Sequence, residues 1–217
     1  MAKELSLAVF QEEAAAFAKR ESLHRDKELF GVTDGKAVGT YLEHKFQASL
    51  HERYEFPHGN SAKGIDFPHL DVDIKVTSIR QPQSSCPFKS ARQKVYGLGY
   101  SLLVFVCDKK DDARTKTGLL DIKHVIFVEK ERTGDYQTTS GLLKLLGNGA
   151  NKDDVLAFFA ERMLPMDEIQ AGLLAEEVLR QPPAPGYLTV SNALQWRLQY
   201  GRVIEQAGSV DGILRLA

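Results

Sequence analysis

The spacing of apolar residues predicts two amphipathic helices near the start of the sequence. Over Lys3–Leu23, apolar residues recur at helical intervals. The same spacing returns over Ala37–Tyr54, after the turn-forming segment Thr33–Lys36. The apolar stripe of this second helix consists of Val38, Leu42, Phe46 and Leu50. Each helix therefore has one face suited to packing against a sheet or another helix.

The pattern then changes to the shorter period of β-strands. Gly64–Phe67 and Leu70–Ser78 are predicted as short strands, and the polar, proline-containing segment Ile79–Phe88 as a loop. Ser90–Gly97 follows as a predicted helix. Leu102–Cys107 is a continuous apolar run, which is typical of a strand buried on both faces.

Two more strands and a series of helices are predicted for the second half of the chain. The strands are Leu119–Ile122 and His124–Val128, and the helices are Gly141–Leu146, Lys152–Arg162, Asp167–Arg180 and Thr189–Ala207. Gln181–Gly186 is a proline-rich linker. This order of elements indicates an α/β fold with a central mixed sheet flanked by helices. We expect one domain over residues 1–181 and a helical C-terminal extension over residues 182–217.

The final predicted helix allows two interpretations. It can belong to a helix-turn-helix, or it can be a closing helix that packs its apolar residues against the core or at a dimer interface. Those apolar residues are Leu194, Trp196, Leu198 and Val203. The closing helix is the favoured interpretation.

The composition is that of an ordinary globular protein rather than a membrane or secreted one. Of the 217 residues, 43% are apolar and 26% are charged, and no apolar run is long enough to span a membrane. The charged segment Met1–Glu13 does not have the character of a signal peptide. Cys86 and Cys107 are too few for a disulfide framework or a zinc site. We therefore expect a cytoplasmic protein.

The net charge of −1 hides two segments of opposite sign. Ile74–Cys107 contains five cations and no Asp or Glu, whereas Ala150–Gln181 contains three cations and seven anions. A basic segment beside acidic residues can be a polyanion-binding face, although a solvated surface strand and helix have the same composition. The near-zero sum therefore does not exclude a nucleic-acid partner.

Polar and apolar side chains alternate along the predicted strand Leu70–Ser78. The alternation directs the apolar residues to the core and a row of polar residues to the opposite face. The polar row consists of Asp71, Asp73, Lys75 and Thr77. A solvent-exposed strand has the same pattern, but helices are expected to cover this sheet, so the row is predicted to line a cleft. Asp66, on the preceding short strand, can reach the same place.

Clustered carboxylates beside a lysine point to metal-assisted phosphodiester hydrolysis. Mg²⁺ takes one or two carboxylates together with waters and substrate phosphate oxygens. A lysine beside such a metal can orient or deprotonate a water and stabilise charge on the phosphate. Glu43 lies at the edge of the apolar stripe of the second helix, where it faces either the margin of the sheet or solvent.

These residues resemble the motif of the PD-(D/E)xK nuclease superfamily, which includes many type II restriction endonucleases. Asp66 matches the first acid, Asp73-Ile74-Lys75 matches the second acid and the lysine, and Glu43 matches the acid on the preceding helix. The predicted order of elements over Ala37–Cys107, about a third of the chain, matches the common core of the superfamily.

Two departures from the superfamily pattern concern the first acid. Ile65 stands where the superfamily usually has proline, and only six residues separate Asp66 from Asp73. Asp71 therefore remains a rival for one of the acidic roles. Gln93, on the following predicted helix, either supports the site as a glutamine does in some relatives or is an ordinary exposed helix residue; the second interpretation is favoured.

The resemblance implies a role for each residue of the motif. Asp66 and Asp73 would bind Mg²⁺, with the carbonyl oxygen of Ile74 as a further ligand. Lys75 would position the attacking water. Glu43 would hold a second metal or a water in the outer shell.

The basic segment after this strand is expected to contact DNA. Its loop carries side chains suited to base edges, because arginine can bond guanine and glutamine can bond adenine. The residues predicted to read bases are Arg80, Gln81, Gln83, Ser84 and Ser85. Those predicted to touch phosphates are Lys89, Arg92 and Lys94. A polar surface loop without a DNA role remains the alternative.

By resemblance, we expect a Mg²⁺-dependent type II restriction endonuclease that cuts double-stranded DNA at a specific sequence and leaves 5′-phosphate ends. A homodimer is expected because a two-fold symmetric protein matches a palindromic site. The alternatives are a repair or junction-resolving nuclease of the same superfamily, and a non-catalytic DNA-binding module.

Overall fold

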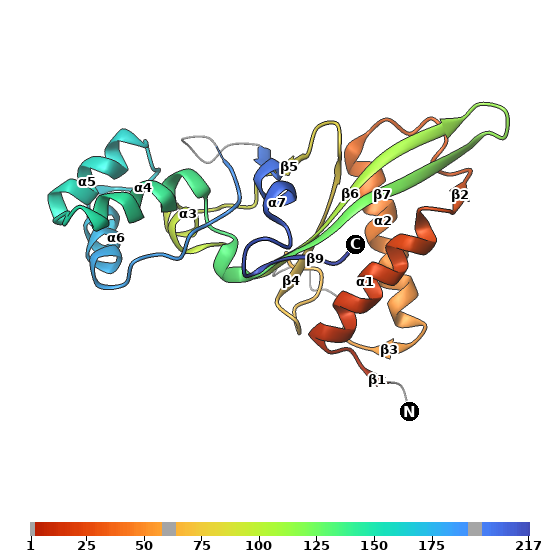
Figure 1. Ribbon diagram of the computed structural model, residues 1–217, viewed down its shortest axis with the longest axis horizontal. Coiled ribbons are helices and arrows are strands. Elements are labelled where there is room, and N and C mark those ends of the chain that lie inside the picture. The colour runs from red at the N-terminus through yellow and green to blue at the C-terminus, as the bar shows by residue number, and fades with distance from the viewer. Residues whose placement is uncertain (1–2, 58–63, 191–196) are drawn as a thin grey trace. The chain divides into compact units, whose positions relative to one another are not determined.

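Two long neighbouring strands, β6 (Ser101–Asp112) and β7 (Thr117–Val128), lie in the middle of the main sheet (Figure 1). The computed structural model describes residues 3–57, 64–190 and 197–217. The chain forms two units: a sheet unit of Met1–Pro82, Leu102–Val128 and Gln206–Ala217, and a helical unit of Gln83–Ser101 and Glu129–Glu205. The chain therefore passes from one unit to the other at four points along the sequence.

The main sheet has five strands in the order β2-β7-β6-β4, with β9 also paired to β7. Strands β2 (Arg25–Asp26), β6 and β9 (Ile213–Arg215) are antiparallel to β7. Strand β4 (Val72–Ser78) lies next to β6 at the other end of this order. A separate two-stranded parallel sheet joins β1 (Lys3–Glu4) to β3 (Tyr54–Glu55). The predicted α/β class with a central mixed sheet flanked by helices is confirmed.

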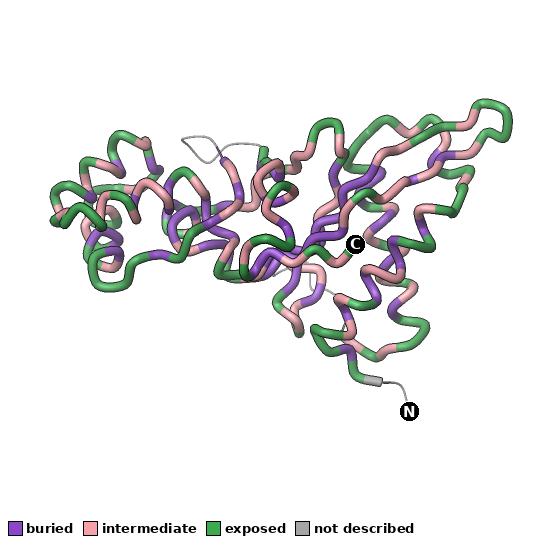
Figure 2. The backbone as a smooth tube through the Cα atoms, viewed as in Figure 1, coloured by how far each residue is buried: buried purple, intermediate pink, exposed green. Residues whose placement is uncertain are grey.

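The apolar run Leu102–Cys107 is buried on both faces of β6, as predicted (Figure 2). The two strands predicted after it form one continuous strand, β7. Its pairing with β6 shifts at one point: Val106 lies opposite His124, but Cys107 lies opposite Ile122. Lys123 is therefore the extra residue of a β-bulge, and it lies at the gap between the two predicted strands.

Helices α1 (Leu7–Glu21) and α2 (Gly35–His51) cover one face of the sheet. Ser6 and Asp34 cap their first turns, because each side-chain oxygen accepts backbone N–H groups that have no partner within the helix. Phenylalanine rings from both helices and the sheet unit meet in the core. These are Phe10, Phe17, Phe46, Phe67 and Phe105. Both predicted N-terminal helices are confirmed, but their predicted ends are wrong, because Lys3–Glu4 forms β1 and Tyr54 belongs to β3.

The helical unit contains most of the remaining helices. They are α3 (Ala91–Tyr96), the short 3₁₀ helix η1 (Lys130–Arg132), α4 (Tyr136–Gly147), α5 (Lys152–Glu161), α6 (Glu168–Arg180) and, crossing its boundary by one residue, α7 (Gly201–Gln206). Helices α3, α4, α5 and α6 share a core that includes Val95, Leu142, Val155, Phe159 and Val178. The predicted helices over this region are confirmed, apart from the C-terminal one.

Three further details of the predicted secondary structure are wrong. The expected helix Thr189–Ala207 is, within the described residues, a strand β8 (Arg197–Gln199) followed by the short α7; Leu194 and Trp196 lie outside the described residues. The expected loop Ile79–Phe88 contains strand β5 (Gln83–Ser85), which pairs with β8. The expected strand Gly64–Phe67 is only an isolated bridge between Phe67 and Val72.

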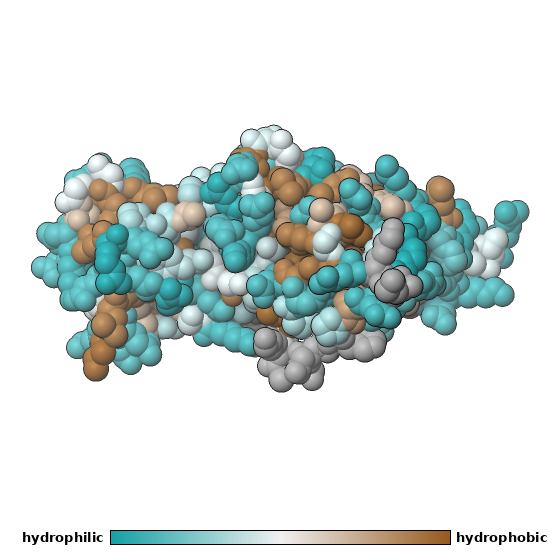
Figure 3. All heavy atoms as spheres, turned by 90° about the horizontal axis from the view of Figure 1, so that it is seen from below, coloured by the Kyte–Doolittle hydropathy of each residue, from teal (hydrophilic) through white to brown (hydrophobic). Residues whose placement is uncertain are grey.

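The surface seen in Figure 3 is largely hydrophilic, with apolar side chains gathered in small patches. Within residues 3–57, 64–190 and 197–217, no helix is both long and apolar enough to cross a membrane.

Candidate active site

A tight turn brings Asp66 beside strand β4. The backbone N–H and C=O groups of Phe67 are both bonded to Val72, at 2.9 and 3.2 Å, so the chain reverses direction between these residues. Asp71 closes the turn with φ at 52°, a conformation that Asp tolerates better than most residues. The Asp66 Oδ2 atom then accepts the backbone N–H of Ile74 at 2.7 Å. The first acid of the motif is therefore fixed to the strand that carries Asp73 and Lys75.

Asp73 and Lys75 project from the same face of β4, as the alternation predicts. The Lys75 ammonium forms an ion pair with the Asp73 carboxylate and donates to the Ile74 carbonyl oxygen at 3.2 Å. Asp73 is only 4% exposed. Burial raises its pKa to about 7; the Lys75 charge opposes this rise, and the neighbouring Asp66 adds to it. The pair thus combines a buried acid with a cation at the same point of the strand.

Glu43 reaches the same cluster from helix α2. A Cβ atom at Gly39, one turn earlier, would lie 3.9 Å from Cβ of Val76, so α2 packs close against β4 here. Glu43 is half-buried. Burial raises its pKa first, the negative charge of Asp66 raises it further, and the positive charge of Lys75 opposes both. The structure therefore brings Glu43, Asp66, Asp73 and Lys75 together in the sheet unit.

The other two members of the predicted polar row are placed differently. Asp71 precedes the first residue of β4 and is exposed in the turn, so it does not share a strand face with Asp73. Its left-handed conformation is the reason, because a residue at positive φ interrupts the alternation of an extended strand. Thr77 is buried, and its hydroxyl donates a hydrogen bond to the Gln81 carbonyl oxygen at 3.5 Å.

The donor atoms of this cluster suit a hard divalent cation. Asp66 and Asp73 supply carboxylates and Ile74 a carbonyl, and Mg²⁺ typically takes one or two carboxylates and completes its shell with water. Across the described residues, no group of three or more His, Cys, Asp or Glu side chains is arranged to hold a metal. A site here therefore depends on two carboxylates with oxygen from the backbone and water. Burial, and to a lesser degree the negative charge of Asp66, raises the pKa of Asp73, and a bound cation would offset both effects.

The residues predicted to read bases fall in both units. In the sheet unit, Gln81 is exposed, and Arg80 is exposed with its Nε atom 3.2 Å from an Asp108 carboxylate oxygen. In the helical unit, Gln83, Ser84 and Ser85 form strand β5. The predicted loop is thus partly a strand with an ordered partner.

Of the three predicted phosphate contacts, only Lys89 has an exposed side chain that makes no hydrogen bond or ion pair with the described residues. The Arg92 guanidinium donates two hydrogen bonds to the Glu177 carboxylate of α6, from Nε at 3.1 Å and from Nη2 at 2.7 Å. It also lies over the Tyr96 ring. The prediction for Lys94 is wrong: its side chain is 1% exposed, and its Nζ atom lies 3.8 Å from a buried Asp135 oxygen. Burial lowers its pKa, and Asp135 opposes that shift.

Gln93 has a local role at the start of α3. Its Oε1 atom accepts the backbone N–H of Lys89 at 2.6 Å, and its Nε2 atom donates to the Leu98 carbonyl at 3.5 Å. These bonds hold the segments at both ends of α3. Gln93 is therefore not an ordinary exposed helix residue, and its structural role accounts for it without a role in catalysis.

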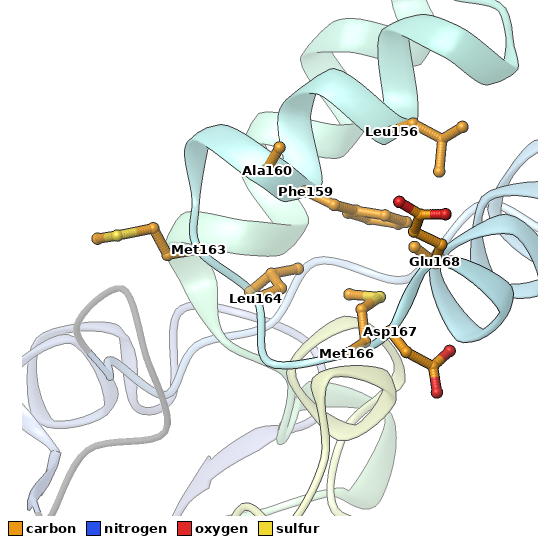
Figure 4. A pocket seen from close by; sticks show the side chains of 9 residues that line it. Leu156, Phe159, Ala160, Met163, Leu164, Met166, Asp167 and Glu168 are labelled. Carbon is orange, nitrogen blue, oxygen red and sulfur yellow. The ribbon is translucent and has the colours of Figure 1, made fainter.

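A cavity of about 430 Å³ lies between α5 and α6 of the helical unit (Figure 4). Its walls are mainly apolar, including Leu156, Phe159 and Met166. Asp167 at its edge is engaged in capping α6, where its Oδ1 atom accepts the Gln170 N–H at 2.7 Å. No lysine, histidine or cysteine is among the described residues that line it. The cavity therefore lacks the combination of carboxylates and a lysine that meets at β4.

Comparison with known proteins identifies the class of enzyme. A family model described as type II restriction enzyme NspV matches residues 4–215. The type II restriction enzyme NspV of Nostoc sp. (strain ATCC 29411 / PCC 7524) is 62% identical over 210 residues, covering 97% of this chain and 96% of that protein. No solved structure gives a significant match. The predicted class, a site-specific deoxyribonuclease, is confirmed, and the chain belongs to the NspV family of type II restriction enzymes.

Proposed function

We propose that this enzyme hydrolyses DNA phosphodiester bonds with Mg²⁺, using the PD-(D/E)xK arrangement formed by Asp66, Asp73, Lys75 and Glu43. The observation that carries the proposal is the meeting of three acids and a lysine around one edge of β4. Cleavage breaks the bond between phosphorus and the 3′ oxygen and leaves a 5′-phosphate and a 3′-hydroxyl.

Asp66, Asp73 and the Ile74 carbonyl are the groups that would hold the metal. Bound Mg²⁺ supplies Lewis-acid stabilisation of the phosphate charge and lowers the pKa of a coordinated water. The hydrogen bond from Ile74 N–H keeps Asp66 oriented toward Asp73. The residues thus form a preorganised acidic site, which costs less reorganisation than one assembled on binding.

Lys75 acts on the water that attacks phosphorus. Its ammonium, held beside Asp73, orients that water through a hydrogen bond and stabilises negative charge as the phosphorus gains a fifth oxygen. Glu43, half-buried with a raised pKa, holds a second water at the outer edge of the site. Arg80, Gln81 and Lys89, all exposed, provide contacts to the duplex.

The proposal is tested by incubating the full chain with plasmid DNA in Mg²⁺ and in EDTA, beside a Lys75→Ala variant. Discrete fragments from the wild type in Mg²⁺, and their loss in EDTA and in the variant, are expected. A smear would indicate cleavage without sequence preference, and selective cutting of branched DNA would indicate a junction-resolving enzyme. Unchanged cleavage by Lys75→Ala would overturn the catalytic assignment.

We further propose that the enzyme works as a cytoplasmic homodimer. Two-fold symmetry suits a palindromic site, and the free thiols of Cys86 and Cys107 fit a reducing compartment. Ile169 and Leu173, one turn apart on α6, are 77% and 64% exposed, and a second copy would cover them. Light scattering on the wild type and on Ile169→Ser/Leu173→Ser tests this: the wild type is expected as a dimer and the variant as a monomer.

A further inference from the structure

Strands β5 and β8 form a two-stranded antiparallel ribbon within the helical unit. Gln83 lies opposite Gln199, Ser84 opposite Leu198, and Ser85 opposite Arg197. The two strands come from distant parts of the sequence, so the ribbon cannot be predicted from the sequence of either strand by itself. β5 begins a few residues after β4, the strand that carries Asp73 and Lys75.

The two faces of this ribbon differ sharply in character. Because side chains alternate along a strand and directly opposed residues share a face, Ser84 and Leu198 lie on one side. Leu198 is fully buried, and the Ser84 hydroxyl is 2.7 Å from the hydroxyl of the buried Tyr200. This side anchors the ribbon to the rest of the unit.

The opposite face carries only side chains that can bond base edges. Its four members are Gln83, Ser85, Arg197 and Gln199. Ser85, Arg197 and Gln199 are exposed. None of the six ribbon residues is acidic, so the face offers no charge that would repel phosphates.

We propose that the β5–β8 ribbon enters the major groove of the duplex, and that Arg197 and Gln199 are specificity-determining residues. The proposal rests on the endonuclease function above and extends it to the residues that select the sequence. The major groove is wide enough for a two-stranded ribbon. There, arginine can form two bonds to O6 and N7 of guanine, and glutamine two bonds to N6 and N7 of adenine.

Arg197 and Gln199 are placed to read bases because their backbone is fixed while their side chains are not engaged. The Gln199 N–H donates to the Thr189 carbonyl at 2.9 Å, and Gln199 is followed directly by the buried Tyr200. Within the part of the chain that the structure describes, the side chains of Arg197 and Gln199 have no hydrogen bond or ion pair. By contrast, the arginines Arg80 and Arg92 are paired with carboxylates.

The test is to digest bacterial genomic DNA of known sequence and to sequence the fragment ends for the wild type, Arg197→Ala and Gln199→Ala. Each variant is expected to cut the wild-type site about 10- to 100-fold more slowly, the equivalent of ~1–3 kcal/mol. Each should also accept other bases at one position of the site, and the two positions should differ. Arg197→Lys is expected to retain part of the preference.

The matched control is Arg180→Ala, which removes an exposed arginine from the end of α6 in the same unit and should leave rate and specificity unchanged. An equal loss at every sequence, with no relaxed position, would make Arg197 a phosphate contact and overturn the proposal. Unchanged specificity in both variants would also overturn it.

A second readout separates this proposal from the catalytic one. Duplexes selected from a random library by the metal-free full-length protein should share a sequence, and Arg197→Ala should fail to select one position of it. This experiment needs no cleavage. If the wild type did not cut DNA in Mg²⁺ but the variant lost selection as expected, the proposed catalytic assignment would fail while the ribbon assignment held. Equal selection by both would overturn the ribbon assignment alone.

Discussion

The Asp66 carboxylate accepts the backbone N–H of Ile74 at 2.7 Å, and this bond links the first acid of the site to the strand that bears the second. Ile74 is fully buried, so its N–H has no access to water if Asp66 is removed. Asp66 therefore has a structural role in addition to its proposed role in metal binding. Different substitutions of Asp66 can separate the two roles.

Asp66→Asn is expected to lose cleavage but to keep its fold. Its amide oxygen can still accept the Ile74 N–H, while the lost charge weakens Mg²⁺ binding, so the rate at low Mg²⁺ should fall about 100-fold and recover partly at high Mg²⁺. Asp66→Ala should in addition lose ~1–3 kcal/mol of unfolding free energy, because a buried N–H is left unpaired. Cleavage rates and urea unfolding of both variants check these outcomes.

The matched control for that experiment is Asp71→Asn. Asp71 is exposed in the turn and lies outside the alternation of β4, so its neutralisation should change neither cleavage nor stability appreciably. Wild-type cleavage by Asp66→Asn together with inactivity of Asp71→Asn would transfer the metal-binding role to Asp71.

Lys75→Ala is expected to lower the cleavage rate about 1,000-fold while DNA binding is largely retained, because the proposed role of the ammonium is to act on the attacking water and not on the duplex as a whole. Lys75→Arg should also be impaired, since a planar guanidinium cannot replace a compact ammonium beside Asp73. Single-turnover cleavage and a metal-free binding assay separate the two effects. A proportional loss of binding would contradict the assignment.

The stability of the metal-free wild type is expected to fall between about pH 4 and pH 7. The pKa of Asp73 is raised from 3.8 to about 7 in the folded protein, so between these values the folded state holds a proton that the unfolded state has lost. That stabilisation is complete at low pH and is lost as the pH rises through about 7, with an upper bound of ~4 kcal/mol.

Asp73→Asn removes this titration and provides the comparison. In EDTA at pH 8, the inactive variant should melt at a higher temperature than the wild type, and the difference should shrink toward pH 5. Mg²⁺ should raise the melting temperature of the wild type and not of the variant. A wild type whose stability does not change across this range would contradict the raised pKa.

Lys94→Met and Lys89→Ala should affect different properties, although the two lysines are close in sequence. Lys94 and Asp135 form a buried pair, so Lys94→Met should cost ~3–5 kcal/mol of unfolding free energy. Lys89 is exposed, so Lys89→Ala should leave stability unchanged and reduce the slope of log affinity against log salt by about 1. Thermal unfolding and a salt titration of DNA binding distinguish these outcomes.

Sequence reasoning located the acidic cluster because its information is local. Asp73 and Lys75 are two positions apart on one strand, and Asp66 follows from a short turn. Glu43 was found because helical spacing places it on the side of α2 next to the apolar stripe. The placements of Asp73, Lys75 and Glu43 follow from the regular repeat of side-chain directions along a strand or a helix, and this repeat can be read from the sequence.

The ribbon and the buried lysine were missed because their partners are distant in the sequence. β8 has three residues, too few for alternation to be distinguished from helical spacing, and its partner β5 lies more than a hundred positions earlier. Lys94 looks like any other cation of the basic segment until Asp135 is placed against it. A single sequence carries no signal for either pairing.

The four crossings of the chain between the sheet unit and the helical unit affect how new specificities can arise. Because each unit is built from separate stretches of sequence, a single recombination event between two related genes cannot exchange one unit whole. A hybrid that combined the acidic cluster of one enzyme with the ribbon of another would need a junction at every crossing. Divergence of cleavage sites within such a family is therefore expected to proceed by point substitutions, with positions 197 and 199 among the first to examine.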